Sequence, residues 1–177
     1  MLVVTGGAQG TDALAALLAS ERHIPTRIVV GPSHRAVRRG ITPITGEDME
    51  EALPHVTQAA RTLNKIVKNP ITLELLMRNY HIVRDADCVY AFGKRGCGNQ
   101  IDGGTGWSMA LAQQLDKQVF LYDVISRRWY KWNRHDEPQP LSLNTRLALH
   151  PNTTAIVGTR ALHLYPHAEA ELRRLFA

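Results

Sequence analysis

Cysteines are scarce in this chain, since only Cys88 and Cys97 occur among its 177 residues. One lies in a strand-like run and the other in a glycine-rich loop, which excludes a disulfide-stabilised scaffold. Long apolar runs are also missing, and none approaches the roughly 20 residues that a membrane-spanning helix needs. The amino terminus lacks the basic region of a signal peptide and enters an apolar run directly. We therefore expect a soluble, cytoplasmic protein that makes no membrane contact.

Strong charge of either sign is absent as well. The chain has 21 basic and 16 acidic residues, a net charge of +5 and a pI near 9.5. This mildly basic balance is compatible with phosphorylated ligands or nucleic acid, but it is far from an arginine-rich arm. A hydrophobic content of 44% is ordinary for a globular protein. The length predicts a single domain over residues 1–177.

A glycine-rich turn near the start of the chain is the strongest local signal. The β-branched run Val3–Thr5 is followed by Gly6, Gly7, Ala8, Gln9, Gly10, Thr11 and Asp12, and then by good helix formers. Free amides at the start of a helix and the helix dipole favour an anion in such a turn. Thr11 is expected to be the N-cap, and Asp12 to lie in the first turn. The G-x-G-x-x-G spacing and the lysine of a P-loop are both lacking, so neither of those motifs is present.

A second turn of the same kind, Asp102-Gly103-Gly104-Thr105-Gly106, precedes a helical stretch at Trp107–Leu115. Around the two turns, short apolar runs alternate with helical periodicity, which predicts an α/β fold with a parallel sheet and helices on both faces. Right-handed crossovers bring the carboxyl ends of all the strands to one edge of the sheet. The turns after Thr5, Val30, Phe92 and Val157 should therefore open at one crevice, where α/β sheets bind ligands.

Three further features allow two interpretations each. The second strand ends in a basic segment with His34, Arg35, Arg38 and Arg39 rather than in the acidic residue of an NAD site, so it is either a phosphate contact or a solvated loop. Glu74 and Arg78, four residues apart, form a surface ion pair or belong to a site. The aromatic run Trp129–Trp132 covers a core edge or stacks on a base.

The motifs together resemble the SLOG superfamily, which groups the lonely-guy (LOG) phosphoribohydrolases, the DNA-processing protein DprA and small YspA/YpsA-like proteins. The resemblance is carried by the Gly6–Asp12 turn, Met77-Arg78-Asn79, Asp85-Ala86-Asp87 before a strand, and Gly103-Gly104-Thr105 opening a helix. Those folds usually begin with a strand that ends in Gly-Ser/Thr-Arg. Here Val157-Gly158-Thr159-Arg160 comes last, so the chain is similar to the circularly permuted YpsA-like group.

This resemblance implies a three-layer Rossmann-like sheet of about five parallel strands. Its expected spatial order is 27–30, 2–5, 154–158, 88–92, 118–122. The ligand crevice should lie between the strands 154–158 and 88–92. In the unpermuted order the closing helix would lead into the opening strand. Met1 and Ala177 should therefore lie near each other.

One departure from the LOG pattern bears on activity. Those hydrolases carry Pro-Gly-Gly-x-Gly-Thr-x-x-Glu, and aligning the second turn places Asp102 at the proline, Trp107 at the threonine and Ala110 at the glutamate. Arg78 can stand for the family's arginine. Cleavage of a base–ribose bond needs a carboxylate near an oxocarbenium-like transition state. Asp12, Glu74 or Asp102 could supply it, so the candidate catalytic residues are Arg78, Asp12, Glu74 and Asp102.

The first hypothesis is a sensor or carrier that binds a nucleotide or a nucleotide-derived phosphorylated metabolite. Its phosphates would lie on the amides of the two glycine turns, with Arg78 and Arg160 as counter-charges. The expected ligand-binding residues are Gly6, Gly7, Ala8, Gln9, Gly10, Thr11, Asn79, Gly93, Gly103, Gly104, Thr105, Gly106, Trp107, Gly158, Thr159 and Arg160.

Two alternatives remain. One is an N-glycosidic hydrolase or transferase that acts on nucleoside 5′-phosphates. The other, by analogy with DprA, is single-stranded nucleic-acid binding through Arg35, Arg38, Arg39 and the tryptophans; it ranks last because the basic residues are few. No metal and no resident cofactor are expected, and a homodimer is the expected oligomer.

Overall fold

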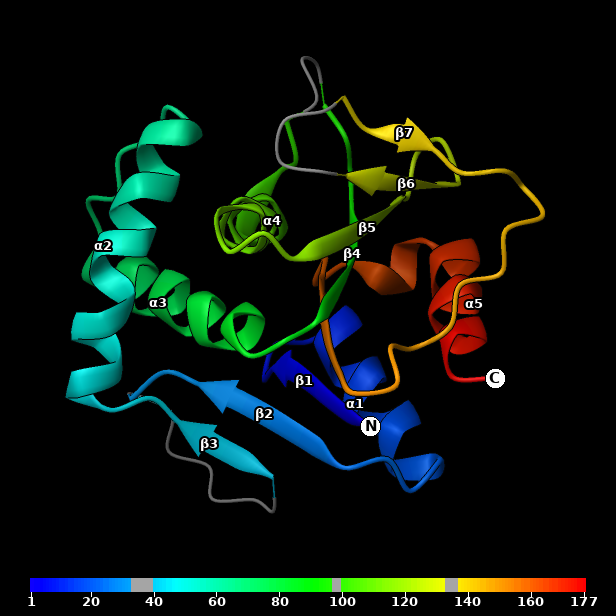
Figure 1. Ribbon diagram of the computed structural model, residues 1–177, viewed down its shortest axis with the longest axis horizontal. Helices are drawn as coiled ribbons and strands as arrows, with labels where there is room; N and C mark the ends of the chain where they lie inside the picture. Colours follow the sequence, from blue (N-terminus) through cyan, green and yellow to red (C-terminus); the bar gives the residue numbers. More distant parts are fainter. Residues whose placement is uncertain (33–39, 97–99, 133–136) are drawn as a thin grey trace.

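The computed structural model describes residues 1–32, 40–96, 100–132 and 137–177, and it shows three layers (Figure 1). A central sheet has α1 (Thr11–Glu21) and α5 (Pro166–Leu175) on one face. The other face carries α2 (Gly46–Thr62), α3 (Pro70–Arg84) and α4 (Gly103–Gln114). The predicted basic residues His34, Arg35, Arg38 and Arg39, and also Cys97, lie outside the described residues.

Within the described residues, the sheet has eight strands in the order β3-β2-β1-β8-β4-β5-β6-β7. Its strands are β1 (Leu2–Gly6), β2 (Thr26–Val30), β3 (Ile41–Pro43), β4 (Cys88–Gly93), β5 (Gln118–Asp123), β6 (Arg128–Trp132), β7 (Gln139–Pro140) and β8 (Thr153–Gly158). The central five, β2-β1-β8-β4-β5, are parallel and lie in the order predicted from the sequence.

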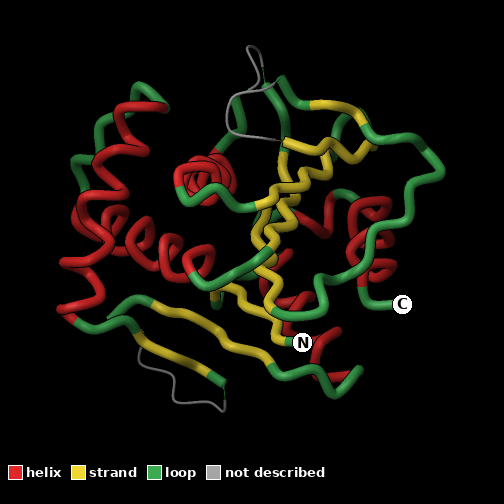
Figure 2. Tube along the Cα trace, viewed as in Figure 1, coloured by secondary structure: helices red, strands yellow, loops and turns green. Residues whose placement is uncertain are grey.

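The predicted strand number is wrong, because β3, β6 and β7, which extend the sheet at its two sides, were not expected as strands. β3 is only three residues long and contains Pro43, so it gives little strand signal and adds to β2 as a parallel edge. β6 and β7 extend the other edge in antiparallel pairs. Figure 2 shows these strands continuing the sheet beyond β5. The sheet is therefore mixed, with a parallel centre.

The continuously apolar strands are explained by helices on both faces. Val4, Val89 and Ala155 pack among α2, α3 and α4, whereas Val3 and Ile156 pack among α1 and α5. Alternate residues of a strand point to opposite faces, so a doubly covered strand must be apolar at every position.

Helix ends follow local signals, with one exception. Thr45 and Asp48 form the capping box of α2, and the helix continues through Pro54. Asn69 caps α3, whose first residue is Pro70. The predicted N-cap of α1 is wrong: Gly10 holds that position with φ of 78°, and Thr11 is the first helical residue. A glycine accommodates this φ without strain, which Thr11 would not.

The aromatic run covers a core edge. Trp129 is 8% exposed, donates from Nε1 to Glu171 Oε2 at 3.0 Å and packs against Tyr90, Phe92 and Tyr122. Its faces are thus occupied by neighbouring side chains within the described chain. The structural interpretation of Trp129 is confirmed.

Two features concern the whole molecule. The chain ends lie on the same side of the structure (Figure 1), and α5 packs beside α1. Among the described residues, none of the helices combines the length and the apolar character needed to cross a bilayer.

Candidate functional site

A cavity of about 510 Å³ opens at the carboxyl ends of β8 and β4. This is the position where the winding of the sheet reverses, because β1 and β2 lie to one side and β5 to the other. The cavity is lined by Ala8, Asp12, Thr72, Leu75, Leu76, Arg78, Asn79, Ile82, Gly93, Lys94, Asp102, Gly103, Gly104, Thr105, Trp107, Ser108, Val157, Gly158, Thr159 and Arg160. Of the turns expected to open here, those after Phe92 and Val157 and the second glycine turn line the cavity, whereas Gly31, after Val30, does not.

The amino terminus of α4 forms one wall. Asp102 is its N-cap and makes no side-chain capping bond, and Gly103 has φ of 65°. Asn79 donates from Nδ2 to the Gly104 carbonyl at 3.4 Å, which links this turn to α3. The turn packs closely on β4, since a methyl group at Gly93 would lie 3.1 Å from Thr105 Cγ2. First-turn amides of a helix that are not capped by a side chain suit an anionic oxygen.

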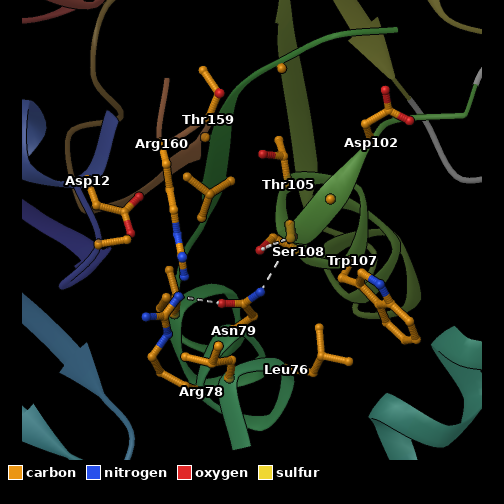
Figure 3. A pocket seen from close by; sticks show the side chains of 18 of the residues that line it. Asp12, Leu76, Arg78, Asn79, Asp102, Thr105, Trp107, Ser108, Thr159 and Arg160 are labelled. Atoms are coloured by element: carbon orange, nitrogen blue, oxygen red, sulfur yellow. Dashed lines mark hydrogen bonds between the residues drawn. The ribbon is translucent and has the colours of Figure 1, made fainter. Parts of the chain in front are cut away.

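Two guanidinium groups meet in the cavity. Figure 3 shows Arg160 extending toward Arg78, which comes from α3. Arg78 Nη2 donates to Asn79 Oδ1 at 2.9 Å, while its buried Nε has no acceptor in the described chain. Burial lowers the pKa of Arg78; Asp12 acts in the opposite direction, and Arg160 lowers it further. Like charges placed this close favour an anion between them.

Asp12 lies beside these arginines. Its side chain turns back to Gly6, where an added methyl group would lie 2.6 Å from Asp12 Oδ2 and 3.0 Å from Arg78 Cζ. Only a glycine therefore allows both groups to approach the end of β1. Burial raises the pKa of Asp12 to about 7, although Arg78, the Ala8 amide and Arg160 all oppose this shift. The carboxyl group can thus gain or lose a proton near neutrality.

The remaining wall is largely apolar. It consists of Leu75, Leu76 and Ile82 from α3, Trp107 from α4 and Val157 from β8. Leu76 and Trp107 are 3% and 7% exposed, so only part of each side chain faces the cavity. A polar end and an apolar wall in one cavity are typical of sites for organic ligands.

The first glycine turn contributes less than expected. Only Ala8 and Asp12 of the Gly6–Asp12 stretch line the cavity. The Thr11 amide and hydroxyl both donate to the Thr159 carbonyl, at 3.2 and 3.1 Å, and an added methyl at Gly10 would overlap that oxygen. The turn is thus packed against the segment after β8, and Gly6, Gly7, Gln9, Gly10 and Thr11 are outside the lining.

The other predicted residues divide in the same way. The cavity is lined by Arg78 and by these other predicted residues: Asn79, Gly93, Asp102, Gly103, Gly104, Thr105, Trp107, Gly158, Thr159 and Arg160. Gly106 is packed against the Ile101 carbonyl, and Glu74 lies beside Gly31 at the end of β2, so neither belongs to the lining.

Several lining residues were not foreseen from the sequence: Thr72, Leu75, Leu76, Ile82, Lys94, Ser108 and Val157. Four of them lie on α3 within two helical turns of Arg78: Thr72, Leu75, Leu76 and Ile82. Helical spacing from Arg78 and Asn79 could have identified them.

A second cluster of polar groups lies away from the cavity. Atoms of Asp48, Glu51 and His81 that could bind a metal come within 4.8 Å of one another. Each has another partner: Asp48 accepts from Thr45, Glu51 from Arg84 and Tyr80, and His81 Nε2 contacts the Asp48 carbonyl at 2.8 Å. The cluster serves to join α2 to α3.

Comparisons with known proteins give a fold relationship. No protein-family model matches the chain, and no curated protein matches it in sequence. A solved structure named "Putative molybdenum carrier protein", from Syntrophus aciditrophicus SB, is similar with a TM-score of 0.56 and 16% sequence identity. The likeness covers 99% of this chain and 93% of that protein. At this identity it shows a shared α/β fold alone.

Proposed function

We propose that this protein binds a nucleotide or a nucleotide-derived phosphorylated metabolite in the cavity and acts as its carrier or sensor. The observation that carries the proposal is the convergence of Arg78 and Arg160 beside the first turn of α4. Two cations facing each other repel, and an oxyanion between them would remove that repulsion. Guanidinium groups bind phosphate oxygens in a bidentate manner, and helix amides add further donors.

The rest of the cavity supports an organic ligand rather than a bare ion. Its volume of about 510 Å³ is within the range of small-molecule sites, roughly 300–1,000 Å³. Trp107, Leu76 and Val157 offer apolar surface to a base or another ring. The name of the similar structure agrees with a carrier role, and molybdate, like phosphate, is an oxyanion.

The test is a binding screen by thermal shift and calorimetry with nucleoside 5′-phosphates, sugar phosphates, NAD derivatives, phosphate and molybdate. A ligand present at about 100 times its Kd should stabilise the protein by about 2.7 kcal/mol. The variant Arg160→Ala, changed at an exposed side chain, should fold normally and bind at least about tenfold more weakly. Arg128→Ala, changed at an exposed arginine of β6 outside the cavity, is the matched control and should bind as the parent does.

Two outcomes would contradict the proposal. One is that no phosphorylated compound of the screen binds. The other is that Arg160→Ala and Arg128→Ala bind equally well. Stronger binding of molybdate than of every nucleotide would keep the anion site but change the ligand.

One observation favours the hydrolase alternative. Asp12 lies beside Arg78 in the cavity, and a carboxyl group with pKa about 7 could act as an acid or a base. The position equivalent to the LOG glutamate is Ala110, which is 6% exposed and brings no carboxylate. Chromatography of nucleotides incubated with the protein separates the functions, because a carrier releases no free base.

The nucleic-acid alternative receives less support. Trp129 is packed into the core edge, so it does not offer a free face to a base. Arg35, Arg38 and Arg39 lie outside the described residues. The homodimer stays a prediction, and sedimentation would test it.

A further inference from the structure

Asp12 is a buried carboxyl group inside a cavity that gathers positive charge. It is 6% exposed and lines the cavity from the first turn of α1. Its Oδ2 and the Arg78 guanidinium both approach Gly6, 2.6 and 3.0 Å from the point that a methyl group would occupy there. An anion bound by Arg78 would therefore lie close to this carboxyl group.

The groups that face Asp12 come from several elements. Arg78 comes from α3 and Arg160 from the segment after β8, and both act on it electrostatically. The Thr5 hydroxyl of β1 and the Ala8 amide also act on Asp12 by hydrogen bonding and oppose the rise in its pKa. The same hydroxyl donates to the Ile156 carbonyl at 2.9 Å. From α5, Ala168 and Leu172 belong to the apolar cluster that also contains Ala15 and Leu18 of α1. From β2, Ile28 and Val30 lie beside Gly7.

The charge balance of this group depends on one proton. With Asp12 ionised, two guanidinium groups are opposed by one carboxylate, and an incoming anion meets a like charge. With Asp12 protonated, both cations are available and the carboxyl group can donate a hydrogen bond to the anion. Bringing negative charge beside a buried carboxylate favours its neutral form.

We propose that binding of an oxyanion in this cavity takes up one proton from the solvent, which is then held on the Asp12 carboxyl group. The proton forms an O–H bond at a carboxylate oxygen, no other covalent bond changes, and release of the anion returns the proton. This inference rests on the proposed function, and it adds the proton as a second ligand of the same site.

The direction of the pH dependence follows from linkage. Without anion, burial holds the pKa of Asp12 at about 7. A bound anion raises this pKa, so the anion binds most tightly below the free pKa and progressively more weakly as the pH rises above it. Each unit of increase in the pKa corresponds to a tenfold change in affinity. We expect at least about tenfold weaker binding at about pH 8.5 than at about pH 6.

Sulfate is the probe for this test, because it remains a dianion across that range and brings no titration of its own. Calorimetry in two buffers of different ionisation enthalpy measures the protons taken up for each anion bound. Just above pH 7 about half or more of the Asp12 carboxyl groups are ionised without anion, so we expect an uptake of about half a proton or more per sulfate. Titration of the Asp12 carboxyl carbon by nuclear magnetic resonance, with and without sulfate, should show the pKa rising on binding.

Two variants assign the proton. Asp12→Asn should bind sulfate with little pH dependence and without proton uptake. Glu21→Gln, changed at an exposed carboxylate of the same helix outside the cavity, is the matched control and should keep both properties. If Asp12→Asn fails to fold, the two measurements on the parent protein decide the question.

The outcomes separate this inference from the proposed function. Nucleotide binding with no sulfate binding at about pH 6, or sulfate binding without proton uptake just above pH 7, would overturn the inference alone. Proton uptake that persists in Asp12→Asn would also overturn it. Absence of binding by every anion and nucleotide at both pH values would overturn the proposed function as well.

Discussion

Gly104 and Gly106 lie two residues apart in the first turn of α4, but their surroundings differ. A methyl group at Gly106 would overlap the Ile101 carbonyl oxygen, which belongs to the backbone and cannot move aside cheaply. A methyl group at Gly104 would have Asn79 Nδ2, at 3.8 Å, as its nearest neighbour. Gly104 lines the cavity and Gly106 does not.

Alanine substitutions should therefore separate folding from binding. Gly106→Ala should lower the free energy of unfolding by about 1–3 kcal/mol, as overpacking does. Gly104→Ala should keep or slightly raise stability, because alanine favours a helix over glycine by up to about 1 kcal/mol, but it should weaken ligand binding. Urea denaturation and calorimetry on both variants measure the two effects. Loss of stability in Gly104→Ala would contradict this account of the turn.

The residues of the site show which parts of it could be predicted from the sequence. Asp12 was expected in the first turn of α1, and Arg78 was expected to act as a counter-charge. Their meeting at Gly6 depends on how α3 crosses the sheet, and no local signal contains that information. Thr11 was misread as a cap because threonine favours this position, whereas the close contact with Thr159 requires glycine there.

At the scale of elements, the strands that the sequence predicted correctly are those covered on both faces. The apolar runs of β1, β2, β4 and β8 lead into glycine, and parallel pairing in the centre follows from the alternation with helices. β3 was not predicted, because a segment of three residues that contains a proline has the sequence pattern of a loop. β6 was recognised only as an aromatic cluster, and its antiparallel pairing with β5 depends on the turn between them.

A charge network holds three of these elements together. Asp85, at the end of α3, accepts from Arg84 Nε at 2.8 Å and from Arg27 Nη2 of β2 at 2.9 Å. Arg84 also bonds to Glu51 of α2 at 2.9 Å. Hydrogen bonding from Arg84, supported by Arg27, lowers the pKa of Asp85 to about 2. The Asp85 side chain is 38% exposed, so solvent screening limits its contribution.

Removal of this carboxylate should give a small, pH-dependent loss of stability. Asp85→Asn should lower the free energy of unfolding at neutral pH by about 1 kcal/mol or less. Because the folded pKa is below the unfolded one, the contribution is present above about pH 4 and is lost as the pH falls toward 2. Denaturation at about pH 7 and pH 3 measures it. Glu21→Gln, at the carboxyl end of α1, is the control and should not destabilise.

At the scale of the whole molecule, the order of the elements is the one expected for a circularly permuted chain. β8 pairs in parallel with both β1 and β4, and α5 lies on the same face as α1. If Ala177 were joined to Met1, α5 would become the crossover helix from β8 to β1. One helix would then link β8 to β1, β1 to β2 and β4 to β5, while β2 would still reach β4 through β3, α2 and α3.

A circular permutant tests this arrangement. A flexible linker of about ten residues, reaching roughly 17 Å, would join Ala177 to Met1, and new ends would be placed before Thr153 in the exposed Pro151–Asn152 segment. All strand pairs are kept, so the permutant should match the parent in circular dichroism and bind the same ligand. A second permutant opened between Tyr90 and Ala91, inside the fully buried β4, should fail to fold. Failure of the first permutant alone would show that the continuity of β8 with the preceding chain matters more than the strand order. Equal folding of both would show that an unbroken β4 is not needed, which would also contradict this account.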